Sequence, residues 1–170
     1  MDKFQSLFQV RMATYDDIPS ILEITKEAFL KYRELSGTDH LAALEETYDD
    51  VKKDIDEKIV LIALSNDVPV GSVRVQVFED GTAYLSRFGV KVTSQNNGIG
   101  KSIMNLVDEI MRKKGVRSIA LHTGAKITAL IRFYYGRGFY VDSTDKSRGY
   151  IRALLIKEYP PEKRQIGDTK

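Results

Sequence analysis

The stretch QNNGIGKS, residues 95–102, has the composition of an anion-binding turn. An apolar segment ends near Val92 just before it, and a segment with apolar residues at helical spacing follows it. A helix that begins here presents unpaired backbone amides and the positive end of its dipole. Gly98 and Gly100 have no side chains to obstruct a ligand. The stretch is therefore a candidate phosphate-binding site.

Two common phosphate-binding patterns fit this stretch only in part. A nucleoside-triphosphate loop has glycine where this chain has Gln95. A dinucleotide loop has a third glycine where this chain has Ile103, and it requires a run of βα units that the chain lacks. Lys101 and Ser102 could add a charge and a hydroxyl, but a glycine-rich helix start without a ligand explains the local pattern equally well.

Length and composition predict one globular domain, residues 1–159, followed by a polar tail, residues 160–170. The chain has 170 residues, no cysteine, two histidines and a net charge of +2, which argues against disulfides, a metal site and nucleic-acid binding. No apolar run approaches the ~18 residues of a membrane span, and the first residues do not resemble a signal peptide. We therefore expect a soluble cytoplasmic protein that binds no membrane.

Hydrophobic periodicity predicts an α/β fold. Strands are predicted at residues 8–12, 59–65, 70–78, 82–92, 118–123, 138–141 and 150–158. Helices are predicted from Asp17 to the break at Ser36-Gly37, along an apolar stripe from Leu41 to Ile55, from residue 98 to Gly115, and over 127–136. Short turns join three consecutive strands, so we expect a mixed, largely antiparallel sheet of six to seven strands with about four helices and one strand-helix-strand crossover.

Four parts of the chain together resemble the GNAT superfamily of N-acetyltransferases. QNNGIG matches the family's Gln/Arg-x-x-Gly-x-Gly/Ala motif, and LSRFGV, residues 85–90, precedes it at the usual spacing. FYYGRGF, residues 133–139, is similar to the family's Phe-Tyr-x-x-x-Gly-Phe, and VRMATYDDIPSILEI is similar to its first strand and helix. The resemblance implies a GNAT-like fold and direct transfer of an acetyl group from acetyl-CoA, without a metal, to a primary amine on a small molecule or peptide.

The resemblance also implies roles for individual residues. Backbone groups of Val90 and Val92 would hold the acetyl carbonyl and the pantetheine arm, and Tyr134 would protonate the departing thiolate. The pyrophosphate would be wrapped by the backbone amides of Gln95, Asn96, Asn97, Gly98, Ile99, Gly100, Lys101 and Ser102. The neighbouring Tyr135 is the better candidate for packing alone. The chain departs from the family at Val92, often proline, and at Ile127, often asparagine.

The general base is open at this stage. Many family members have a glutamate where this chain has Tyr84. His122 ends a central strand and could reach the amine directly or through water, although the sequence favours a strand histidine that makes only a local hydrogen bond. Glu27, Glu34 and His40 lie in the region that usually determines specificity, but each also reads as a surface residue. Release of the amine proton to bulk water is a further route.

The acceptor is the least defined part of the prediction. The region around the second helix contains several carboxylates, which would suit a cationic amine: Asp39, Glu45, Glu46, Asp49 and Asp50. Small amines, polyamines, aminoglycosides and peptide N-termini all stay open. Homodimers are common in the family and are an option here. The alternative from another functional class is an acyl-CoA-binding sensor or interaction module without turnover.

Overall fold

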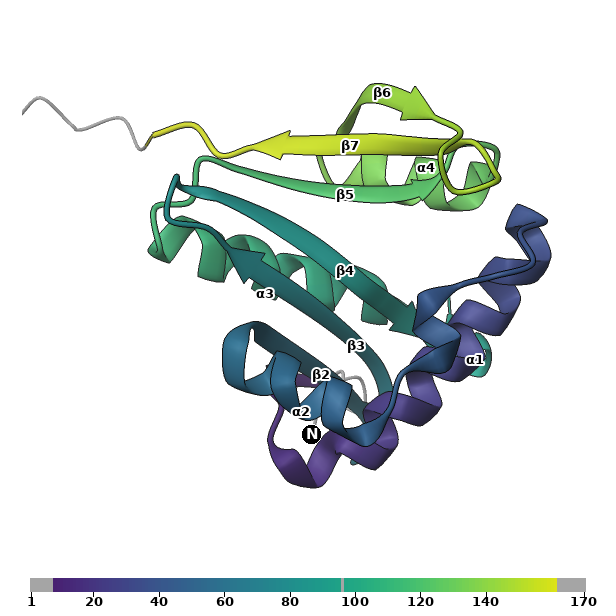
Figure 1. Ribbon diagram of the computed structural model, residues 1–170. Coiled ribbons are helices and arrows are strands. Elements are labelled where there is room, and N and C mark those ends of the chain that lie inside the picture. The colour runs from purple at the N-terminus through teal and green to yellow at the C-terminus, as the bar shows by residue number, and fades with distance from the viewer. Residues whose placement is uncertain (1–7, 96, 162–170) are drawn as a thin grey trace, which may run out of the picture.

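The computed structural model describes residues 8–95 and 97–161, and its strands form one mixed seven-stranded sheet in the order β1-β2-β3-β4-β5-β7-β6 (Figure 1). The strands are β1 Phe8–Met12, β2 Ile59–Ser65, β3 Val68–Val77, β4 Thr82–Val90, β5 Ser118–Gly124, β6 Tyr140–Asp145 and β7 Arg152–Glu158. The helices are α1 Ile18–Ser36, α2 Tyr48–Glu57, α3 Ile99–Lys113 and α4 Thr128–Gly136, with 3-10 turns η1 Tyr15–Asp17, η2 Ala42–Glu45 and η3 Val92–Ser94. Only β4 and β5 pair in parallel, and α3 connects them along the chain. This arrangement confirms the predicted fold class.

Apolar clusters cover both faces of the first half of the sheet. In β2, Leu61 faces the cluster that α3 completes, and Ile62 faces the cluster formed with α1 and α2. Successive strand residues point to opposite faces, so a strand covered on both sides reads as the continuous apolar run IVLIALS. The sheet is therefore a rigid support for the segments at its edges.

The second helix is shorter than predicted. α2 begins at Tyr48, because Thr47 and Asp50 form a capping box: the Thr47 amide donates to Asp50 at 2.9 Å, and the Asp50 amide donates to Thr47 Oγ1 at 3.3 Å. Leu41 and Leu44 continue the apolar spacing but belong to the irregular segment and 3-10 turn before the helix. Periodicity alone did not detect this break.

The sheet opens between β4 and β5. The two strands pair only from Thr82 to Tyr84 and then diverge toward α1 and α4 (Figure 1). A bulge in β4 places Arg87 and Phe88 together opposite Val73 of β3, and Arg87 has a φ of 52°, which is uncommon for a residue other than glycine. The bulge turns the end of β4 away from β5.

Three expectations concern the chain as a whole. No helix in the described ranges is both long and apolar enough to cross a membrane. Across residues 8–95 and 97–161, no group of three or more acidic or histidine side chains is placed to hold a metal ion. Most of the predicted tail, residues 162–170, lies outside the part of the chain that the structure describes.

Candidate active site

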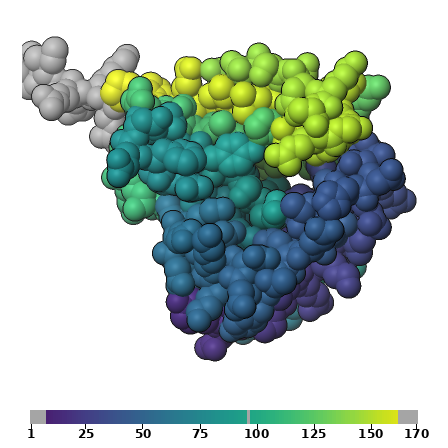
Figure 2. All heavy atoms as spheres, viewed as in Figure 1, coloured from purple at the N-terminus to yellow at the C-terminus, as the bar shows by residue number. Residues whose placement is uncertain are grey.

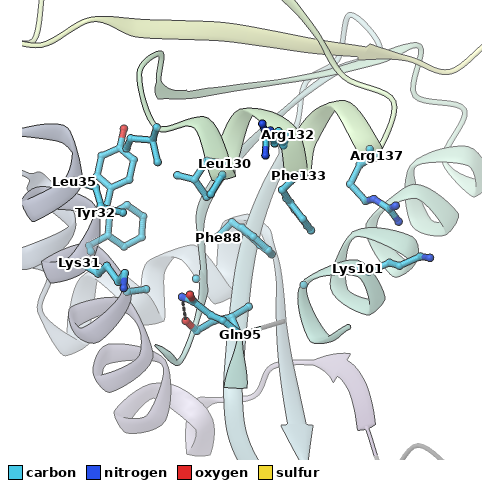
Figure 3. A pocket seen from close by; sticks show the side chains of 18 of the residues that line it. Lys31, Tyr32, Leu35, Phe88, Gln95, Lys101, Leu130, Arg132, Phe133 and Arg137 are labelled. Atoms are coloured by element: carbon cyan, nitrogen blue, oxygen red, sulfur yellow. Dashed lines mark hydrogen bonds between the residues drawn. The ribbon is translucent and has the colours of Figure 1, made fainter. Parts of the chain in front are cut away.

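The larger of two neighbouring cavities is the α3 cleft, with a volume of about 540 Å³ (Figure 3). It lies between α1, the end of β4, the start of α3, and α4. Its lining residues are Ala28, Phe29, Lys31, Tyr32, Leu35, Phe88, Gly89, Val90, Gln95, Gly98, Gly100, Lys101, Ile127, Ala129, Leu130, Arg132, Phe133, Gly136 and Arg137.

Backbone amides that have no partner within α3 lie at one end of the α3 cleft. Ser102 donates the first intrahelical hydrogen bond of α3 to the Gly98 carbonyl at 2.9 Å, so the amides of Ile99, Gly100 and Lys101 have no partner within the helix. Gly98 has a φ of 80° and nothing within 4 Å of the position that a Cβ would occupy. The site therefore combines open space with the positive end of a helix dipole, which suits an anion.

Gly100 has a packing role in addition to the one predicted. A Cβ at this position would lie 3.2 Å from the Phe88 ring and 3.4 Å from the Phe133 ring. These two rings stack with centroids 5.5 Å apart and planes inclined by 12°. The missing side chain thus makes room for the stacked Phe88 and Phe133 rings as well as for a ligand.

Four cationic side chains among the described residues line the α3 cleft, Lys31, Lys101, Arg132 and Arg137, and only Lys101 was considered from the sequence for binding an anion. Lys101 and Arg137 lie on the same side of the cleft, and Arg132 lies above the centre on α4 (Figure 3). Arg137 is part of FYYGRGF, and Arg132 immediately precedes it. Basic residues beside this motif were therefore the available signal for an anionic ligand.

Only part of the predicted cofactor-binding set lines the α3 cleft. Lining residues from that set are Val90, Gln95, Gly98, Gly100 and Lys101. The Gln95 and Ser102 amides cannot serve as predicted, because they donate to the carbonyls of Val92 at 3.3 Å and Gly98. Asn96 lies outside the described residues.

Three other members of the set are not lining residues of the α3 cleft, although the prediction concerned their backbone amides and not their side chains. Ile99 is 2% exposed and packs in the core. Val92 and Asn97 are exposed and do not line the cleft. Near them, the Gln95 side chain donates from Nε2 to the Val90 carbonyl at 3.2 Å (Figure 3), so the loop is tied to the end of β4.

Ile127, the departure from the family's asparagine, is buried and lines the α3 cleft. Its side chain fills the space beside Gly124, where a Cβ would lie 2.7 Å from Ile127 Cδ1. The polar contact that an asparagine would offer is thus replaced by apolar surface.

The second cavity, the β4–β5 pocket, has a volume of about 310 Å³ and lies where β4 and β5 diverge. It is lined by Phe29, Tyr32, His40, Leu41, Ala42, Ala43, Tyr84, Leu85, Ser86, Arg87, Phe88, Leu121, His122, Thr123, Leu130, Tyr134, Arg148, Tyr150 and Arg152. Figure 2 shows a hollow between the yellow-green segment before β7 and the blue segment after α1. The two cavities share Phe29, Tyr32, Phe88 and Leu130.

Tyr134 lies in the wall of the β4–β5 pocket and is 5% exposed. Its ring packs edge-on against Phe88, Phe133 and Phe139 at centroid distances of 6.2, 5.3 and 5.7 Å. Burial raises the pKa of the Tyr134 phenol, so it is protonated at neutral pH. Tyr135 is 52% exposed, so the prediction that it serves packing was wrong.

Tyr84 and His122 form a hydrogen-bonded pair in the same pocket. The Tyr84 hydroxyl lies 2.6 Å from His122 Nδ1. Burial, and next the positive charge of Arg152, lower the pKa of His122 below its ordinary value of 6.5. The imidazole is therefore neutral at pH 7 and can accept a proton.

The carboxylates of the expected acidic acceptor region do not line the two cavities, so the preference for a cationic amine stays a prediction without support from them. None of Asp39, Glu45, Glu46, Asp49 and Asp50 lines either cavity. Glu46 is instead paired with buried Arg74 and with Arg87, and Asp50 caps α2. Glu27 and Glu34 lie outside both cavities, whereas His40 lines the β4–β5 pocket, 3.5 Å from Glu45.

The model of the acetyltransferase (GNAT) family matches residues 19–139, which include the QNNGIGKS stretch before and at the start of α3, and FYYGRGF. The chain belongs to this family. It is accordingly an acetyltransferase, and acetyl-CoA is its expected cosubstrate.

Individual relatives agree with the family assignment. Spermidine N(1)-acetyltransferase of Thermoplasma acidophilum is 23% identical over 82% of this chain and 92% of its own length. PaiA N-acetyltransferase from Thermoplasma acidophilum, solved in complex with coenzyme A, has a TM-score of 0.79 at 21% identity, covering 89% of this chain and 99% of that one. The ribosomal-protein-S18-alanine N-acetyltransferase from Escherichia coli has a TM-score of 0.74 at 14% identity, with coverages of 94% and 98%. These structures share the fold of this chain.

Proposed function

We propose that this protein transfers the acetyl group of acetyl-CoA directly to a primary amine, with the thioester in the α3 cleft and the amine in the β4–β5 pocket. The observation that carries this proposal is the shared wall of the two cavities, formed by Phe29, Tyr32, Phe88 and Leu130. A ligand in each cavity would contact this wall, so the two reacting groups would lie close together. Such alignment of reactants can supply up to ~7–11 kcal/mol of rate acceleration.

The residues of the α3 cleft fit coenzyme A in charge and polarity. The amides of Ile99 to Lys101 suit the pyrophosphate, and Arg132 and Arg137 suit phosphate groups. Phe88 and Ile127 offer apolar surface to the pantetheine arm. When bound, the thioester supplies the activated acetyl group, and the role of the Val90 backbone toward its carbonyl stays a prediction.

Tyr134 is the proposed general acid. Its raised pKa keeps the phenol protonated, and within the described residues its hydroxyl has no hydrogen-bond partner that competes for the proton. During transfer, the amine nitrogen forms a bond to the acetyl carbon, the carbon–sulfur bond breaks, and Tyr134 donates its proton to the departing sulfur.

His122 is the proposed general base. Its neutral imidazole lines the pocket, and the Tyr84 hydroxyl at 2.6 Å fixes the ring. When Nδ1–H donates to the Tyr84 oxygen, the Nε2 lone pair is available for the amine proton. Glu27 and Glu34 are not favoured as bases, because neither lines a cavity.

The experiment is a panel of amines with acetyl-CoA, read by thiol release and by the mass of the product. The panel includes spermidine and peptides with a free N-terminal alanine, the acceptors that the names of two relatives indicate. Amine-dependent release with an acetylated product is the expected result. Tight coenzyme A binding without release for any amine would favour the non-catalytic sensor. A cytoplasmic location and a homodimer stay predictions.

A further inference from the structure

We propose that the acceptor amine carries an anionic oxygen group, with a carboxylate as the simplest case, and that Arg148 and Arg152 bind this group in the β4–β5 pocket. This inference rests on the proposed acetyl transfer and specifies its substrate class.

The first observation is the charge of the pocket. The permanently charged residues that line the cavity are all arginines, and no carboxylate among the described residues lines it: the set is Arg87, Arg148 and Arg152, beside the imidazoles of His40 and His122. Arg87 is paired with Glu46 at 3.1 Å, and Arg152 with Asp145 at 3.5 Å. Arg148 makes no ion pair among the residues that the structure describes, so its charge is available to a ligand.

The second observation is an unsatisfied donor. Arg152 has a side chain 16% exposed, and its Nε is buried without a hydrogen-bond partner in the described part of the chain. A buried donor without an acceptor costs free energy, and such cases are few in folded proteins. The guanidinium of Arg152 lines the pocket and could pair with a carboxylate or phosphate oxygen, because guanidinium groups bind oxyanions through charge-assisted hydrogen bonds.

The third observation is that the nearby carboxylates already have structural partners. Glu46 contacts Arg74 and Arg87, and Asp54 contacts Arg74 at 2.9 Å. These groups cannot also neutralise a polyamine. The pocket thus lacks the carboxylates that a cationic acceptor would require.

The same cations would help the chemistry. An amine must lose its proton before it attacks a thioester, and positive charges nearby disfavour the protonated form. Arg148 and Arg152 would therefore hold the anionic group and keep the attacking amine neutral, while His122 takes up the proton released in the reaction. A volume of about 310 Å³ suits a small molecule of amino-acid size.

The test compares amines that differ only in the anionic group: phenylalanine with phenethylamine, ornithine with putrescine, and O-phosphoethanolamine with ethanolamine. We expect kcat/KM to be about tenfold or more higher for the anionic member of at least one pair. The carboxylate and phosphate pairs distinguish the two sources of the oxyanion. Equal rates within every pair, or a preference for spermidine, would overturn the proposal while leaving acetyl transfer intact.

Variants locate the contact. Arg148→Glu and Arg152→Gln should remove the preference for the anionic amine, and Arg148→Glu should improve spermidine as an acceptor. Lys146→Gln is the matched control, since Lys146 is an exposed cation in the same segment that lines neither cavity.

Calorimetry of each amine with the coenzyme A complex gives a readout that does not depend on turnover. Weaker binding of the anionic amine to Arg148→Glu supports the inference even if catalysis fails. Unchanged binding in both arginine variants overturns it.

Discussion

The two cavities that meet at Phe88 are built in different ways. The α3 cleft obtains its anion-binding groups from consecutive backbone amides and a left-handed glycine at one helix start. The β4–β5 pocket obtains its polar groups from side chains far apart in the sequence, such as Tyr84, His122 and Arg148. Backbone groups are present whatever the side chains are, so they suit a ligand that all family members share. Side chains vary freely, so they suit the acceptor that distinguishes one member from another.

The largest expected effect concerns Tyr134, which lines the β4–β5 pocket and packs against the shared residue Phe88. Tyr134→Phe keeps the ring packing and removes the proposed acid, so kcat should fall by ~10²–10⁴-fold with coenzyme A affinity nearly unchanged. Tyr135→Phe is the matched control, because Tyr135 is exposed on the same helix. Steady-state kinetics with the best acceptor measure both. Loss of activity in Tyr135→Phe instead would contradict the assignment.

The second prediction tests whether acidic residues near the β4–β5 pocket are structural. Glu46→Gln removes a charge that pairs with Arg74, a side chain only 1% exposed. The free energy of unfolding should fall by about 3 kcal/mol, because a buried charge loses a partner. Asp49→Asn, an exposed change on α2, should alter it little. Denaturant unfolding measures both, and equal stability of the two variants would refute the structural role.

The third prediction concerns the α3 cleft alone. Gly98→Glu places a carboxylate beside the free amides, and repulsion of phosphate should weaken coenzyme A binding by about a hundredfold. Gly115→Glu is the control, because Gly115 has a similar φ of 69° and equally open space at the other end of α3. Calorimetry on both folded variants separates local charge from backbone strain. Similar affinities for the two would argue against phosphate binding at this helix start.

The smallest expected effect is a shift in pH dependence. If His122 is the base, kcat/KM falls as the pH drops through its lowered pKa. Burial lowers the pKa of His122 most, the positive charges of Arg152 and Arg148 lower it further, and the negative charge of Asp145 raises it; the Tyr84 hydroxyl lies at hydrogen-bonding distance from the ring. Arg152→Gln should therefore move the acidic limb of the profile of kcat/KM against pH to higher pH. The measurement uses an amine acceptor that has no anionic group. An unmoved limb in this variant, or an acidic limb that persists in His122→Gln, would show that another group titrates.

Sequence periodicity predicted the elements of the fold well where the local pattern of apolar residues matches their burial in the folded protein. The bounds of β1 and β2 were predicted as observed, because apolar runs bounded by turns leave little choice. The start of α2 was missed, because apolar spacing continued through the turn before Thr47, although the capping box was readable. The structural role of Glu46 was missed as well, since its ion pairs join residues 28 and 41 positions apart and cannot be read from local sequence.

The two cavities also differ in how far the sequence could predict them, because one depends on consecutive residues and the other on residues far apart in the chain. The α3 cleft was found through Gly98 and the loop around it, because a helix start depends on consecutive residues. The β4–β5 pocket depends on the bulge at Arg87 and on the segment before β7, which the fold brings together. Its arginines carried no local signal of a shared site.

The most direct test of the two-cavity account is the affinity of a bisubstrate conjugate, in which phenylalanine is joined through its amine to coenzyme A by an acetyl linker. If the two ligands meet at Phe88, the conjugate should bind about a hundredfold or more tightly than coenzyme A alone. Gly98→Glu should weaken its binding, and Arg148→Glu should remove most of the gain over coenzyme A. A conjugate that binds wild-type protein no more tightly than coenzyme A would contradict the account.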